Sequence, residues 1–336
     1  MKLTLYTWSG IGDSLMALPL IYALKSLGHE VILPSNQQAL PFYEFLRDQE
    51  IISGIASYRH RSVVDWIRAF GNTDKLILPA GVERWQHPLL WALRKGAPAF
   101  GPFLRLGLRI KELETIEDVH EKSPSPKLPL ASNRAQSYIH WIERYGLDFK
   151  LDWLFFEDRV LLKCRERIQK LLIGKGLEPG EYAILYPATI RAEKNMPEPL
   201  VNQIAEYCFE RKIKLVFVGD LAPKNLGLDA HESVVDWSGR RDFGELAGLF
   251  SLSRAVFSVD GGLLHLALAS RCPVVSFWGA TIPDALVMPN HPYHHPLCRY
   301  LPFQPYEGEI VSDSKRLEAF NFSKQEIERA VQKADR

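Results

Sequence analysis

The sequence predicts an α/β protein of two domains, each with a parallel sheet that helices cover on both faces. Two observations support this fold class. Short apolar segments rich in β-formers alternate with helical segments along most of the 336 residues, and this alternation is typical of parallel sheets. The alternating series also occurs twice, once before about residue 150 and once after it. A chain of this length is long enough for two domains.

The first series predicts a domain over residues 1–150. It opens with an expected strand at 2–8, followed by the tight turn Ser9-Gly10-Ile11-Gly12-Asp13 and a helix at 14–27. Pro19 falls inside that helix and should kink it or mark a loose first turn. A proline-containing stretch at 121–131 reads as a linker or loop. The remaining expected segments are a strand at 30–34, a helix at 63–70, a strand at 75–78 and a helix at 133–145.

The second series predicts a domain over residues 151–320. Expected helices and strands alternate in it: helix 159–172, strand 182–186, helix 198–211, strand 214–218, helix 243–252, strand 255–259, helix 263–270 and strand 274–278. The segment 321–336 carries a last expected helix at 323–333. We expect this helix to pack back on the first domain.

Composition and charge exclude several classes of protein. The chain is 46% hydrophobic and 24% charged, which is ordinary for a globular protein and argues against disorder. Its net charge of +1 gives no global basic field, so no nucleic-acid partner is expected. The four cysteines form no CxxC pair, and reduced thiols fit a cytoplasmic protein. We expect no signal peptide and no transmembrane helix.

The turn Gly10-x-Gly12-Asp13 is the first candidate site. Glycines allow the backbone to turn sharply and to approach a ligand. A dinucleotide fingerprint would need a further glycine at position 15, which is Leu15 here, so the sequence disfavours NAD. Asp13 follows a strand end, where α/β folds bind ligands. By itself it fits a helix cap and a catalytic base equally well.

Two segments of the second domain suit an anionic ligand. The loop 187–197 carries Thr189 and Lys194, although a plain solvated loop would look similar. Asp260-Gly261-Gly262 follows an apolar strand and opens a helix, whose bare N–H groups can bind phosphate. The alternative for the two glycines is a simple turn. The alternative for His265, one turn into the helix, is a histidine that packs in the core and binds no ligand. Another strand ends in Gly219-Asp220, which suits a nucleotide contact.

Two further regions have a weaker link to function. Four residues of an expected proline-rich loop could in principle bind zinc, but their spacing matches no closed structural site and no metal is expected: His291, His294, His295 and Cys298. The stretch 84–111 mixes arginines and lysines with aromatic residues. It could hold an anionic amphipathic acceptor or touch a membrane surface. The alternative is an ordinary helix and loop with basic side chains over apolar surface.

Taken in order, these segments resemble glycosyltransferase family 9, the heptosyltransferases of lipopolysaccharide core synthesis. The resemblance covers most of the chain. Its anchors are GxGDSLMALPLIYALK at the N-terminus, KNMP in the middle, and the block from Trp237-Ser238-Gly239 through Gly279-Ala280-Thr281. Three positions depart from the family pattern. Ile190 stands where a second hydroxyl residue is common, Gly261 where Ser or Thr is usual, and Met196 where Trp is usual.

The resemblance implies a GT-B architecture, with two Rossmann-like domains facing a cleft, the first binding the acceptor and the second the donor. It implies an inverting, metal-independent transfer with Asp13 as catalytic base. Its donor-binding residues fall on Thr189, Lys194, Asp220, Asp260, Gly261, Gly262 and His265. Acceptor binding is expected at Gly12, Arg84 and Arg105.

The same resemblance implies the reactants. The donor would be a nucleotide-diphosphate sugar, with ADP-heptose first, and no separate cofactor. The acceptor would be a hydroxyl of a lipopolysaccharide-type glycolipid, with the protein in the cytoplasm and in peripheral contact with the inner membrane. The residues themselves fix neither the base nor the acceptor.

Two other functions remain open. One is a nucleotide-sugar epimerase or hydrolase on the same fold. The other is a non-catalytic homologue that binds a nucleotide sugar and has a regulatory or scaffolding role. Ile190 and Gly261 favour this second alternative, whereas the joint presence of Asp13, Lys194 and Asp260 argues against it.

Overall fold

The computed structural model describes residues 1–7, 10–37, 39–58, 65, 69–71, 73–79, 110–116, 119–122, 130–300 and 312–334. The chain divides into two compact units. Unit 1 comprises residues 1–119 and 132–154, and unit 2 comprises residues 120–131 and 155–336. The sequence placed the boundary at 150/151. Strands β6 (Val119–Lys122) and β7 (Leu130–Asn133) form a small separate sheet at the junction of these ranges.

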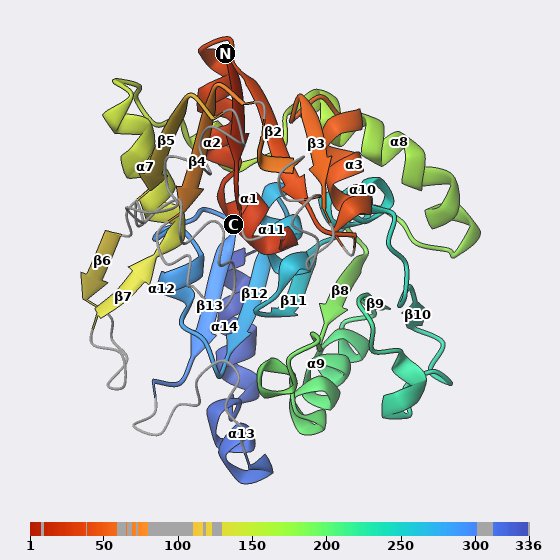
Figure 1. The fold of residues 1–336 in the computed structure, drawn as a ribbon. Helices are drawn as coiled ribbons and strands as arrows, with labels where there is room; N and C mark the ends of the chain where they lie inside the picture. The colour runs from red at the N-terminus through yellow and green to blue at the C-terminus, as the bar shows by residue number, and fades with distance from the viewer. Residues whose placement is uncertain are drawn as a thin grey trace. The chain divides into compact units, whose positions relative to one another are not determined.

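Unit 1 contains a parallel sheet with the order β3-β2-β1-β4-β5 (Figure 1). Its strands are β1 (Lys2–Leu5), β2 (Glu30–Ser35), β3 (Gly54–Ser57), β4 (Lys75–Pro79) and β5 (Glu112–Ile116). The chain runs outward from β1 to β3 and then returns to the other side of β1. The carboxyl ends of β1 and β4 therefore flank a topological switch point, where open α/β sheets bind ligands.

The helix expected at 14–27 is two helices. α1 (Ile11–Met16) and α2 (Leu18–Ser26) meet at Ala17, and Pro19 occupies the first turn of α2, where its missing N–H is tolerated. Of the two expectations for Pro19, a kink or a first turn, the structure shows the first turn. The other described helices of unit 1 are α3 (Leu40–Asp48), α7 (Arg134–Arg144) and the 3-10 helix η1 (Leu151–Leu154).

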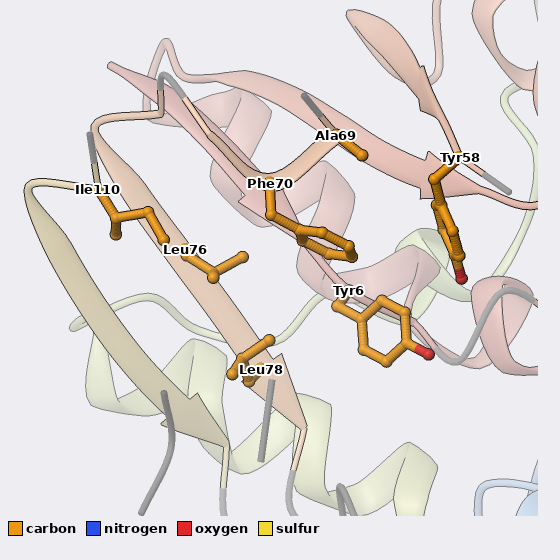
Figure 2. Packing of buried hydrophobic residues seen from close by; sticks show 7 residues of the cluster. All are labelled: Tyr6, Tyr58, Ala69, Phe70, Leu76, Leu78 and Ile110. Atoms are coloured by element: carbon orange, nitrogen blue, oxygen red, sulfur yellow. The ribbon is translucent and has the colours of Figure 1, made fainter. Parts of the chain in front are cut away.

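One face of the unit 1 sheet carries a buried apolar cluster, shown in Figure 2. The Phe70 ring is directed toward Tyr6, with ring centroids 5.7 Å apart, and also contacts Tyr58 at 5.8 Å. Leu76 and Leu78, both of β4, complete the centre of the cluster. Since Tyr6 directly follows β1, this packing fixes the strand end from which the Asp13 turn departs.

Unit 2 contains a parallel sheet with the order β10-β9-β8-β11-β12-β13 (Figure 1). Its strands are β8 (Tyr182–Tyr186), β9 (Lys214–Phe217), β10 (Val234–Asp236), β11 (Ala255–Val259), β12 (Val274–Trp278) and β13 (His294–Cys298). All residues of the three strands β8, β11 and β12 are buried, as expected for a sheet covered on both faces. The switch point lies between β8 and β11.

The helices of unit 2 follow the strands as the sequence predicted for the α/β class, so this fold class is confirmed. They are α8 (Asp158–Gly174), α9 (Glu198–Glu210), α10 (Phe243–Leu252), α11 (Gly262–Ala269), α12 (Pro283–Leu286), α13 (Asp313–Ala319) and α14 (Lys324–Ala334), with the 3-10 helices η2 (Ala192–Lys194) and η3 (Pro223–Leu226). No helix in these described ranges is long and apolar enough to cross a membrane.

Helix α14 belongs to unit 2, where its buried face, with Ile327 and Val331, packs on β12, β13 and α9. Its expected packing on the first domain stays a prediction. One expectation for the C-terminal part is wrong. The histidine-rich segment was taken as a loop, but His294–Cys298 is the edge strand β13. The sequence did not predict this strand, because the segment contains polar residues and Pro296. An edge strand tolerates both.

Helices α8 and α10 approach each other closely at Gly248. A Cβ on Gly248 would meet the backbone carbonyl of Cys164, whose carbon would lie only 2.7 Å away, and also the Ile168 side chain at 2.9 Å. Backbone atoms cannot move aside as a flexible side chain can. The crossing of these two helices therefore depends on glycine at position 248.

We predict that Gly248→Ala lowers the free energy of unfolding by about 1–3 kcal/mol through overpacking. The matched control is Gly174→Ala in α8, where nothing lies within 4 Å of the added Cβ. That change should leave stability unaltered or raise it by up to ~1 kcal/mol. Urea unfolding of both variants measures the difference. Equal stability of the two would contradict the proposed close approach.

Candidate functional site

Asp13 is the third residue of helix α1, and Gly10 is the N-cap of that helix. Asp13 is therefore not the helix cap, which was one of the two readings of the sequence. A Cβ at position 10 would lie 2.5 Å from Asp13 Oδ2. Glycine at position 10 thus leaves the room in which the Asp13 carboxylate lies.

Arg134, the first residue of α7, forms an ion pair with Asp13. Its Nη1 donates to Asp13 Oδ1 at 2.7 Å, and the two side chains are 43% and 26% exposed. The half-buried carboxylate is therefore held in one direction while solvent still reaches it. Sequence reasoning missed Arg134, which lies 121 residues away along the chain. A lone arginine after the capping residue Asn133 carries no local signal for this role.

Three buried hydroxyl groups support the turn beneath Asp13. Ser14 Oγ contacts Thr7 Oγ1 at 2.8 Å and Tyr43 Oη at 2.7 Å, and it donates to the Gly10 carbonyl oxygen at 2.8 Å. All three side chains are at most 1% exposed. The network ties the end of β1, the start of α1 and helix α3 together, so the position of Asp13 is fixed by buried hydrogen bonds rather than by surface contacts.

The predicted acceptor-binding residues are only partly described. Gly12 lies within α1, next to Asp13. Arg84 and Arg105 lie outside the described residues, as does most of the stretch 84–111. Their role stays a prediction from the resemblance.

In unit 2, the loop after β8 is a compact turn that its own hydrogen bonds hold together. Asn195 Oδ1 accepts from Thr189 N at 2.7 Å, and the Pro187 carbonyl accepts from Met196 N at 2.9 Å. Thr189 Oγ1 accepts from Arg191 N at 3.0 Å. These hydrogen bonds hold Thr189 and Lys194 within one turn. The binding role of the loop stays a prediction.

A buried ion pair joins this loop to the start of α11. Lys194 Nζ donates to Asp260 Oδ2 at 2.7 Å, and the two side chains are 11% and 6% exposed. The same oxygen accepts from Thr281 Oγ1 at 2.7 Å. Asp260 therefore connects the segments that follow β8, β11 and β12. Thr281 ends the segment Gly279-Ala280-Thr281 on which the family resemblance partly rests, but nothing in the sequence indicated that it contacts Asp260.

Gly261 brings Thr189 next to the N-terminus of α11. A Cβ at position 261 would lie 2.9 Å from Thr189 Cγ2 and 2.7 Å from Tyr186 Oη. Gly261 is the N-cap of α11 and Gly262 its first residue. The structure thus brings together the two segments that the sequence predicted to bind an anionic ligand: a lysine, a threonine and the bare N–H groups of a helix start.

His265 and Asp220 differ from these residues. His265 is buried in α11, and burial lowers its pKa to about 4. It is therefore neutral near pH 7, which fits the core reading. Asp220 has a side chain that is 60% exposed, and its Oδ1 accepts from Arg241 at 3.0 Å. Its proposed contact with a nucleotide stays a prediction.

His294, in β13, and His291, just before it, pack in the core of unit 2. His294 Nε2 lies 2.7 Å from Ser276 Oγ, and the ring packs edge-on against Trp278. The buried His291 packs edge-on against Phe155. Within the described ranges, no three His, Cys, Asp or Glu side chains converge as metal ligands. All four cysteines are free thiols.

We predict that Asp260→Asn destabilises unit 2 by about 3–5 kcal/mol, because it removes one charge of the buried ion pair with Lys194. Asp220→Asn is the control: it breaks an exposed pair and should cost at most about 1 kcal/mol. Chemical denaturation of both variants measures the two values. A loss at Asp260 no larger than that at Asp220 would show that the buried pair does not organise the unit.

The buried histidines predict acid sensitivity of unit 2. Burial lowers the pKa of His265 and of His291 to about 4, against 6.5 for an exposed histidine. The unfolded chain therefore binds protons first. Stability should be complete above pH 6.5 and fall as the pH drops toward 4, by roughly 3 kcal/mol for each histidine. Urea unfolding from pH 7.5 to 4.5 measures this slope, and His291→Phe should flatten it. An unchanged slope would contradict the assignment.

The chain resembles known proteins in part of its sequence and in its fold. Residues 162–297 match the family model for glycosyltransferase family 9 (heptosyltransferase). None of the curated proteins matches the sequence of the chain. Among solved structures, the ADP-heptose lps heptosyltransferase II of E. coli has a TM-score of 0.65 at 14% identity, and the alignment covers 100% of both chains.

Two further structures share the fold. The E. coli heptosyltransferase WaaC with ADP has a TM-score of 0.57 at 15% identity, over 91% of this chain and 96% of that one. The UDP-GlcNAc 2-epimerase of Methanocaldococcus jannaschii has a TM-score of 0.53 at 12% identity, over 100% and 93%. The predicted resemblance and GT-B fold are thereby confirmed: residues 162–297 match the family 9 model, and the chain shares the fold of these heptosyltransferase structures.

Proposed function

We propose that the chain is an inverting, metal-independent glycosyltransferase that moves heptose from ADP-heptose to a hydroxyl of a lipopolysaccharide-type glycolipid. The observation that carries this proposal is the convergence of Lys194, Thr189 and the Gly261-Gly262 backbone at the switch point of unit 2. A cation, a hydroxyl and helix N–H groups are what a diphosphate needs. No cofactor is required besides the sugar donor.

The donor site is proposed to act on the leaving group. As the bond between the anomeric carbon and the diphosphate oxygen breaks, both electrons go to the diphosphate. Lys194 and Thr189 can then stabilise the added negative charge, together with the N–H groups at the start of α11. In this scheme Asp260 acts indirectly, because its carboxylate already accepts hydrogen bonds from Lys194 and Thr281. It orients the lysine and restrains the loop.

Asp13 is proposed as the general base. It takes the proton of the acceptor hydroxyl while that oxygen attacks the anomeric carbon from the side opposite the diphosphate, which inverts the configuration. The ion pair with Arg134 fixes the direction of the carboxylate, and the buried hydroxyl network fixes the turn that bears it. Such pre-positioning is what makes a weakly basic carboxylate useful.

The reactants are proposed by analogy. Heptosyltransferase II is named for ADP-heptose, and WaaC is solved with ADP. A donor of this type would be met in the cytoplasm, and a glycolipid acceptor at the cytoplasmic face of the inner membrane. The acceptor would be bound by unit 1 and the donor by unit 2. Residues 84–111 are proposed to contact the acceptor through Arg84 and Arg105.

We predict that Asp13→Asn lowers kcat by about 10²- to 10⁴-fold, the usual contribution of a positioned base. Donor affinity should stay unchanged, because the donor-binding residues lie in unit 2. The control is Asp48→Asn, an exposed carboxylate of unit 1 that pairs with its neighbour Arg47. Release of ADP from ADP-heptose, measured with and without a glycolipid acceptor, gives the rate, and calorimetry gives the affinity.

Three outcomes would overturn parts of the proposal. Normal turnover by Asp13→Asn would exclude it as the base. Equal ADP release without any acceptor would indicate a hydrolase or an epimerase-like enzyme. Donor binding without turnover under any acceptor would support the non-catalytic alternative.

A further inference from the structure

Tyr186, the last residue of β8, lies between two glycines of the neighbouring strand ends. A Cβ at Gly219, after β9, would lie 2.7 Å from its Cε2. A Cβ at Gly261, after β11, would lie 2.9 Å from its Cε1 and 2.7 Å from its Oη. The ring thus fills the space on both sides of β8 that side chains at positions 219 and 261 would need. The position of the ring explains why both residues are glycine.

The hydroxyl of Tyr186 is directed at the start of α11. Gly261, the residue that it approaches, is the N-cap and offers no side chain to the bare N–H groups of the helix. Tyr186 is 92% buried, since its exposed fraction is 8%. Within the described part of the chain its Oη makes no hydrogen bond, and this oxygen is not one of the fully buried atoms that lack a partner. The hydroxyl at the tip of an otherwise buried ring can therefore still meet a ligand.

We propose that Tyr186 Oη donates a hydrogen bond to a phosphate of the sugar donor and replaces the hydroxyl that this chain lacks at position 261. The resemblance to family 9 implies a Ser or Thr at that position, where this chain has glycine. Tyr186 Oη occupies the space beside the missing side chain. The helix N–H groups, Thr189 and Lys194 lie around the same point. The loss of one hydroxyl is thus balanced by another from the adjacent strand.

The surroundings keep Tyr186 in the form that this role needs. Burial raises its pKa well above the usual value, and the carboxylates of Asp260 and Asp220 raise it further. The phenol therefore stays protonated at every physiological pH. It can donate a hydrogen bond to an anion but does not add a negative charge next to it.

Tyr186→Phe removes only the hydroxyl and tests the proposal, which rests on the proposed function because the phosphate is that of the donor. Calorimetry of the full chain with ADP should show a Kd raised about 10- to 100-fold, the range of a hydrogen bond to a charged group. Without ligand, the melting temperature should stay the same or rise, since the hydroxyl has no partner to lose.

Tyr182→Phe is the matched control on the same strand. Tyr182 Oη donates to the Leu249 carbonyl at 2.6 Å, so this variant should melt at a lower temperature and keep the wild-type Kd for ADP. The double variant Tyr186→Leu with Gly261→Thr should regain affinity relative to Tyr186→Leu alone, because the smaller leucine makes room for a threonine hydroxyl.

The outcomes distinguish a failure of the proposed sugar donor from a failure of the proposed role of Tyr186. If the wild type binds no ADP, the proposed ADP-sugar donor is wrong. If the wild type binds ADP and Lys194→Ala does not, but Tyr186→Phe binds as tightly as the wild type, the donor site stands and the role of Tyr186 is overturned.

Discussion

The buried carboxylate of Asp260 is the constraint on which the candidate donor site depends. One of its oxygens accepts hydrogen bonds from Lys194 and from Thr281. Through it, the segments that follow three neighbouring strands, β8, β11 and β12, are held at one edge of the sheet. A buried ion pair seldom adds much net stability, but removing one partner is costly. The pair is therefore better understood as fixing one arrangement of the loop and of its lysine.

In unit 1, different contacts hold the candidate carboxylate in place. This carboxylate, Asp13, stands on a short helix that has no capping side chain. The turn is instead held from below by the deeply buried hydroxyl groups of Thr7, Ser14 and Tyr43, and the carboxylate is held from the side by the more exposed Arg134. In both units the candidate group is half-buried or buried and is held by specific hydrogen bonds. Pre-organisation of this kind lowers the cost of ordering a site when a substrate binds.

The structure explains one departure from the family pattern, Gly261, but does not explain another, Ile190. At position 261, glycine is needed because Tyr186 occupies the neighbouring space, and the lost hydroxyl has a nearby substitute. At position 190, by contrast, the isoleucine side chain is 93% exposed, and nothing in the structure explains it. Gly261 therefore no longer argues for a non-catalytic homologue, because the change is part of a consistent local packing.

The sequence by itself determined the α/β class, the two series of elements and the two segments proposed to bind an anion. These features are local: the bounds of β8, α10, β11 and β12 follow from apolar runs between turns, and a strand end followed by glycine or a charged residue is visible without a structure. Only the tertiary structure decided that Arg134, Thr281 and Tyr186 contact the site, and that His294–Cys298 is an edge strand. These depend on contacts between residues far apart along the chain, which leave no periodic pattern in it.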